Sequence, residues 1–140
     1  ILRKSTLFVI FGLILTSTFL FGQGPFPPVE FNVSSGMDVK GSKVCITVTA
    51  NNFINVESIQ LNISYNAALI IPDCPGPSSF VGSALAPAID STNFNCKNIA
   101  NGYLNFVWYS APTTIPDGSV LFTICFTLIG EPGNISPVYF

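Results

Sequence analysis

The sequence lacks histidine and carries little charge, and these two gaps exclude most catalytic chemistry. Its 140 residues include five Lys or Arg and seven Asp or Glu, and no histidine at all. Without an imidazole, a nucleophile loses its commonest general base, and the seven carboxylates are too widely spaced to suggest the close pair that hydrolysis uses. The sequence therefore predicts that the protein is not an enzyme.

Metal sites are disfavoured on similar grounds. A zinc site needs closely spaced cysteine or histidine ligands, and no two of the four cysteines lie within twenty residues of each other. Calcium loops carry clustered aspartates in an Asp-x-Asp-x-Asp pattern, which this chain does not have. We expect no metal and no cofactor.

Positive charge is especially scarce beyond the first residues. After Arg3 and Lys4, only Lys40, Lys43 and Lys97 remain against seven carboxylates, a balance of −4. No basic patch is available to neutralise phosphates, so nucleic acid is not an expected partner.

The first residues have the layout of a secretory signal peptide. Arg3 and Lys4 supply a positive start, Leu7–Phe21 is an apolar run, and Gly22-Gln23 offers a small-residue cleavage point. The run is shorter than the roughly 20 residues that a membrane-spanning helix requires. We expect residues 1–22 to be a helical signal peptide, and the mature protein to be extracellular or at the cell surface without a membrane span. Because the chain starts with Ile1 and not with Met, it is expected to be a fragment at this end.

The remaining residues, 24–140, have the length of one domain and the pattern of an all-β fold. Apolar residues recur at every second position over several stretches, which is the period of a strand with one buried and one wet face. No stretch shows a sustained helical period, and turn signals separate the strands. The sequence predicts an antiparallel β-sandwich with jelly-roll topology. The residues expected to face its core include Ile59, Leu61, Ile63, Tyr65, Leu104, Phe106, Trp108, Phe122, Ile124, Phe126 and Leu128.

The least regular part of the chain is Pro72–Ala100. A stretch of this length without periodicity is uncommon inside a compact domain. We interpret it as an insertion with a short edge strand near Thr92–Asn95. At the other extreme of the domain, Ser136–Phe140 has the pattern of a further strand that begins but is not completed.

The four cysteines predict two disulfides, because export places them in an oxidising compartment. Three connectivities are possible, and we favour Cys45 with Cys125 and Cys74 with Cys96. The second pair brackets the irregular segment, and the first pair shares a polar-side setting on two strands. The alternative is that Cys45 and Cys125 are free, half-buried thiols.

Four segments together resemble a known family. They read GSKVCITVTANNF, SYNAALI, GYLNFVWYS and DGSVLFTICFTLIGEPG, in that order. This pattern resembles the cohesin domains, and more closely the cohesin-like modules of secreted surface proteins in Bacteroidetes-type bacteria, over Val39–Phe140 with a gap at Pro72–Ala100. One departure is Tyr65-Asn66-Ala67, where the family has Tyr-Asp-Pro. A complete module also has a final strand, so the domain is expected to be truncated before it.

The resemblance implies a flattened jelly roll in which one sheet face holds a dockerin module. That face would be built from Ser58–Tyr65, Tyr103–Tyr109 and Val120–Ile129. The same topology would place the strands of Cys45 and Cys125 in different sheets, so that their bridge would have to cross the core or run round an edge. The solvent-side residues carried over to the binding face, with Tyr103 added from its wet position, are Gln60, Asn62, Tyr103, Asn105, Tyr109, Thr123 and Thr127.

The function expected from the resemblance is non-catalytic binding. The module would mediate protein–protein interaction or adhesion on the cell surface, through a dockerin-like or other protein module and within a polysaccharide-degrading assembly. The alternative is a carbohydrate-binding module, in which Tyr103, Trp108 or Tyr109 would stack on a sugar ring. Trp108 shares the parity of Leu104 and Phe106, so it is expected in the core and not on that surface.

Overall fold

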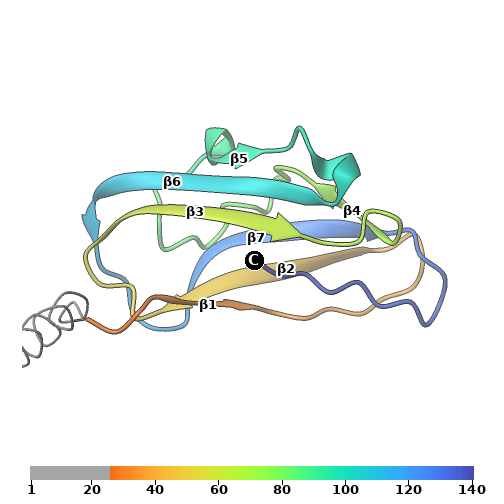
Figure 1. Cartoon of the computed structure of the whole chain (residues 1–140), viewed down its shortest axis with the longest axis horizontal. Helices are drawn as coiled ribbons and strands as arrows, with labels where there is room; N and C mark the ends of the chain where they lie inside the picture. Colours follow the sequence, from red (N-terminus) through yellow and green to blue (C-terminus); the bar gives the residue numbers. More distant parts are fainter. Residues whose placement is uncertain (1–25) are drawn as a thin grey trace, which may run out of the picture.

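The computed structural model describes residues 26–140 and consists of two antiparallel β-sheets stacked face to face (Figure 1). The expected signal peptide lies outside the described residues. The four-stranded sheet has the order β1 (Glu30–Val33), β2 (Lys43–Asn51), β7 (Ser119–Leu128) and β4 (Ile70–Asp73). The three-stranded sheet has the order β3 (Val56–Ser64), β6 (Tyr103–Thr113) and β5 (Phe94–Asn95). The predicted β-sandwich is confirmed.

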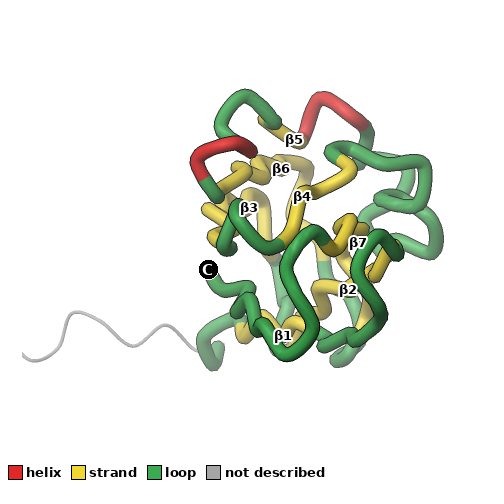
Figure 2. The backbone as a smooth tube through the Cα atoms, turned by 90° about the vertical axis from the view of Figure 1, so that its right-hand side faces the viewer, coloured by secondary structure: helices red, strands yellow, loops and turns green. Residues whose placement is uncertain are grey.

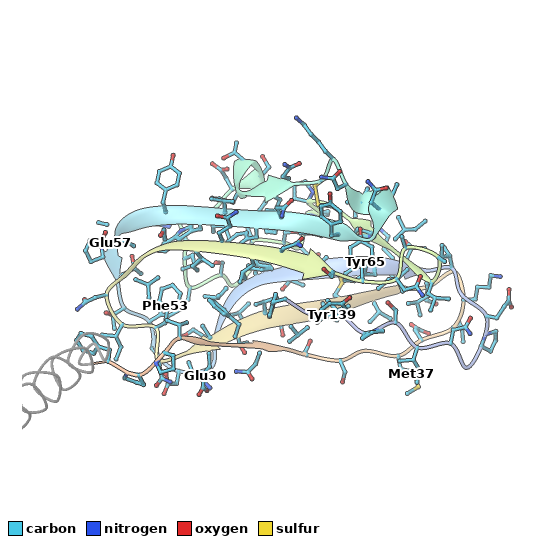
Figure 3. The ribbon with its side chains drawn as sticks, viewed as in Figure 1. Glu30, Met37, Phe53, Glu57, Tyr65 and Tyr139 are labelled. Carbon is cyan, nitrogen blue, oxygen red and sulfur yellow. A yellow bond between two sulfur atoms is a disulfide. The ribbon has the colours of Figure 1, made fainter. Side chains whose placement is uncertain are left out.

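The core lies between the sheets and is built by the two-residue alternation of the strands. In β3 and β6 every second side chain is buried, while its neighbours face solvent. Aromatic rings fill the middle: Phe106 of one sheet packs on Phe122 of the other at a centroid distance of 4.3 Å. Trp108 and Phe53 are fully buried, and the Phe53 ring lies between the two layers (Figure 3). The expected core residues are all buried except Leu128, which is half-buried.

Both expected disulfides are present, but the expected sheet assignment of Cys45 and Cys125 is wrong. β2 and β7 are neighbours in the four-stranded sheet, and their register places Cys45 directly opposite Cys125. The bridge therefore links two paired strands on an outer face and does not cross the core. The assignment of these two strands to different sheets came from the resemblance. The alternation of residues could not correct it, because alternation indicates which face a residue occupies and not which strand lies beside it.

The second disulfide joins the two sheets at the edges formed by β4 and β5. Cys74 directly follows β4 of one sheet and Cys96 directly follows β5 of the other. β4 pairs only with the C-terminal half of β7, and the irregular segment between the two cysteines runs along the N-terminal half. There Thr123 donates its N–H to the Ser79 carbonyl, and Ala84 donates its N–H to the Val120 carbonyl. Two short 3-10 turns, Ser91–Asn93 and Ile99–Asn101, flank β5 (Figure 2).

The end of β3 is fixed by several contacts with distant parts of the chain. Tyr139 pairs with Ser64 through two backbone hydrogen bonds of 2.8 and 3.1 Å, so the last residues lie along the free edge of β3. Gly102 approaches Tyr65 with a φ of +84°, and a Cβ there would lie 2.6 Å from the Tyr65 carbonyl oxygen. The close approach explains why this turn needs glycine.

No helix among residues 26–140 has the length and apolar character needed to cross a bilayer.

The aromatic contact between the sheets gives a direct test of the core. In Phe106→Ala the cavity left between the layers is expected to lower the free energy of unfolding by about 3–5 kcal/mol. The neighbouring side chain on the same strand is the matched control: Val107 points outward, and Val107→Ala is expected to change the free energy by less than about 0.5 kcal/mol. Urea denaturation followed by tryptophan fluorescence measures both. Equal effects at the two positions would contradict the assigned alternation.

A second test concerns Tyr65, whose hydroxyl donates a 2.7 Å hydrogen bond to the Ile99 carbonyl. Burial disfavours the phenolate and raises the pKa of Tyr65 from 10.0 to about 12. Because the folded pKa is the higher one, the associated stabilisation is complete below pH 10 and is lost as the pH rises through about 12. Ultraviolet titration of the phenolate should show a late component that Tyr65→Phe removes. A titration curve unchanged by Tyr65→Phe would be incompatible with this environment.

Candidate functional site

The outer side of the three-stranded sheet presents a polar surface formed by two paired strands, which we term the open face. Its residues are the outward members of residues 58–64 in β3 and 103–109 in β6, and the register places them opposite one another in four cross-strand pairs. Their alternating neighbours are buried in the core, so the fold fixes their direction. The pairs are Ser58 with Tyr109, Gln60 with Val107, Asn62 with Asn105, and Ser64 with Tyr103.

The open face carries no charged side chain. At its centre the amide of Asn105 donates to the Asn62 side-chain oxygen at 3.4 Å. Toward one end Tyr109 is 78% exposed and the adjacent Val107 is 44% exposed, so an aromatic ring and an aliphatic side chain stand free in solvent. The face can therefore offer amide and hydroxyl hydrogen bonds next to an apolar contact, without a strong electrostatic field.

The β5 side of the open face is held by the turn that precedes β5. Asn93 donates its side-chain amide to the Val107 carbonyl at 2.8 Å, which continues the pairing of β5 with β6 by one more position. Asp90 caps this turn. A hydrogen bond from the Thr92 hydroxyl, together with one from the Thr92 backbone N–H, lowers the pKa of Asp90. The capped turn thus supports the backbone of β6 at Val107.

Five of the seven expected binding residues lie together, and two do not. Gln60, Asn62, Tyr103, Asn105 and Tyr109 share the open face.

Placing Thr123 and Thr127 with them was wrong. Both belong to β7 of the four-stranded sheet, where they lie opposite Thr47 and Lys43 on the other outer surface of the molecule. The parity of the two threonines was predicted correctly, but the sheet to which β7 belongs was not.

Three residues of the open face were missing from the expected set. Ser58, Ser64 and Val107 lie opposite Tyr109, Tyr103 and Gln60 respectively. A signal for Val107 was available, because it has the same parity as Tyr103, Asn105 and Tyr109 in β6. Valine is common at both buried and exposed strand positions, so its residue type gave no indication that Val107 is 44% exposed. Trp108 is completely buried, as its parity predicted, and takes no part in the surface.

The described residues contain no group of three His, Cys, Asp or Glu side chains arranged to hold a metal ion.

The sequence matches no protein-family model. It matches no curated protein either.

The fold has clear counterparts among solved structures, three of them from Acetivibrio cellulolyticus. The second type II cohesin module of the cellulosomal adaptor ScaA scaffoldin is 16% identical and has a TM-score of 0.56, covering 83% of this chain and 76% of that one. A mutant type II cohesin–X-dockerin complex gives 17% identity and a TM-score of 0.54, covering 79% and 74%. A type II cohesin domain from the cellulosome gives 17% and 0.50, covering 82% and 84%. At this identity the likeness concerns the fold, and the described residues form a cohesin-like β-sandwich.

Proposed function

We propose that this domain is a non-catalytic protein-binding module that docks a dockerin-like partner on its open face. The observation that carries the proposal is the open face itself: an uncharged, partly apolar sheet surface with an exposed Tyr109, on a fold similar to that of cohesins. One of the similar structures is a cohesin–X-dockerin complex. Solvent-exposed aromatic residues on a rigid sheet are typical anchors of protein interfaces.

The contacts of the open face indicate how such a partner would be held. Tyr109 and Val107 form the only part of the eight-residue face with a large exposed apolar side chain, and we assign the buried centre of the interface to them. Gln60, Asn62 and Asn105 supply donors and acceptors that fix orientation. Because the strands are hydrogen-bonded along their length, the backbone that carries these side chains is already ordered before binding, and only the side chains themselves lose freedom.

We place the module outside the cell, on a cell surface or in a polysaccharide-degrading assembly. Two disulfides support an oxidising compartment. The start of the chain supports export by its signal-peptide pattern. Adhesion through the same face is a form of the same protein–protein interaction.

The test uses the tagged chain as bait for the secreted proteins of its source organism. We expect it to retain proteins that carry a dockerin-like module. Tyr109→Ala should weaken this binding by at least about tenfold, since losing a central aromatic anchor typically costs more than 1.4 kcal/mol.

The control is Thr123→Ala, which truncates a side chain on the outer surface of the other sheet and is expected to leave binding unchanged. Retention of no such protein, or equal loss in both variants, would contradict docking at the open face.

Carbohydrate binding is the second candidate, favoured by the exposure of Tyr109. A single ring offers one stacking position, because Tyr103 is half-buried and Trp108 is in the core. If the module binds sugars, a glycan array should give signals that Tyr109→Ala abolishes and Thr123→Ala preserves. An array without signal would remove this candidate and leave protein docking.

A further inference from the structure

The two disulfides differ in exposure and in what they connect. Cys45 is exposed on the outer surface of the four-stranded sheet and is bonded to its cross-strand neighbour Cys125. Cys74 and Cys96 are both half-buried, pack against the hydrophobic core and connect one sheet to the other. A reagent in solvent therefore meets the first bridge more readily than the second, because access to sulfur limits thiol–disulfide exchange.

An ion pair covers one end of the exposed bridge. Lys43 of β2 lies opposite Thr127, and Asp73 of β4 lies opposite Cys125, so the two residues stand on either side of β7. Their charged ends meet at 3.0 Å, and their side chains consequently cross over β7 beside Cys125. Cys125 is only 7% exposed.

The other end of the bridge, at Cys45, is exposed. Attack on a disulfide sulfur proceeds from the side opposite the leaving sulfur, which for Cys45 is the side of β2 that faces β1. The chain beyond β1 continues beside β2, because Ser34 donates its N–H to the Thr47 carbonyl and Gly36 lies against Val44, but the Cys45 side chain remains exposed. Cys45 is therefore the more accessible sulfur, whereas approach to Cys125 must displace the Lys43–Asp73 pair.

We propose that Cys45–Cys125 is a redox-sensitive latch that an external dithiol opens by attack at Cys45, while Cys74–Cys96 stays closed. A thiolate of the dithiol bonds to the Cys45 sulfur, the Cys45–Cys125 bond breaks, and Cys125 leaves as a thiolate and takes up a proton. The second thiol of the reductant then attacks the reductant's own sulfur and releases Cys45. Two electrons and two protons pass to the protein, and the dithiol becomes a disulfide.

Opening the latch leaves the fold assembled but less stable. β2 and β7 remain paired over eight positions, and their inward side chains stay in the core. The unfolded chain, however, loses a cross-link between residues 80 positions apart, and this loss raises the conformational entropy of the unfolded state. The open face lies on the other sheet and is untouched. The latch thus sets how readily the module unfolds in a reducing environment, and not whether it docks.

The first experiment is a dithiothreitol titration of the native chain, quenched with N-ethylmaleimide and read by peptide mass spectrometry. We expect Cys45 and Cys125 to be labelled together, at least about tenfold faster than Cys74 and Cys96. The partly reduced protein should keep its β-sheet circular dichroism and unfold at a lower temperature. Labelling of all four cysteines at one rate, opening of Cys74–Cys96 first, or loss of the sheet signal with the first bridge would overturn the proposal.

The second experiment locates the attack. Reduced glutathione, with rapid alkylation, should give a mixed disulfide at Cys45 and an alkylated Cys125. In Asp73→Asn, which removes the covering ion pair, adducts should appear at both sulfurs, while Thr47→Ser, a change elsewhere on the same surface, should keep the adduct at Cys45. An adduct at Cys125 in the native chain, or an unchanged distribution in Asp73→Asn, would show that access does not direct the reaction.

Discussion

The packing of one sheet on the other through aromatic rings is the contact on which the rest of this structure depends. Phe106 of β6 packs on Phe122 of β7, and Phe94 of β5 packs on both, with centroids 4.3 to 5.4 Å apart. These rings fix the parity of three strands at once. A slip of one residue in any of them would turn its apolar side chains to solvent and its polar side chains to the core. The open face therefore exists because the opposite side chains are held between the sheets.

Much of this arrangement could be predicted from the sequence, because parity is a local property. Ile59, Leu61 and Ile63 alternate with polar residues, and that pattern alone predicts which side is buried. The same reasoning placed Trp108 in the core despite its usual appeal as a sugar-stacking residue. Of the strand expected near Ser136–Phe140, the structure has an isolated bridge, in which Tyr139 pairs with Ser64 at the edge of β3.

The neighbours of each strand could not be predicted in this way. The two-residue period is the same in every strand and does not indicate which other strand pairs with it. Thr123 and Thr127 were given the right face and the wrong sheet. Cys45 and Cys125 were paired correctly, but their separation into two sheets, taken from the resemblance, was wrong. The segment Pro72–Ala100 has no period at all, and its backbone bonds to β7 depend on where β7 lies after folding.

The two outer surfaces of the sandwich differ in the side-chain cross-links that they carry. The four-stranded sheet carries the cross-links that do not belong to the core: the Cys45–Cys125 bridge and the Lys43–Asp73 pair. The three-stranded sheet carries neither, and among its outward side chains one weak amide contact joins Asn62 and Asn105. Side chains such as Gln60 and Tyr109 therefore contribute little to holding the fold, because the backbone ladder and the buried residues beneath them do so. A surface whose side chains are not needed for folding is free to take the chemistry of a partner, because the core between the sheets and the backbone ladder hold the fold without it.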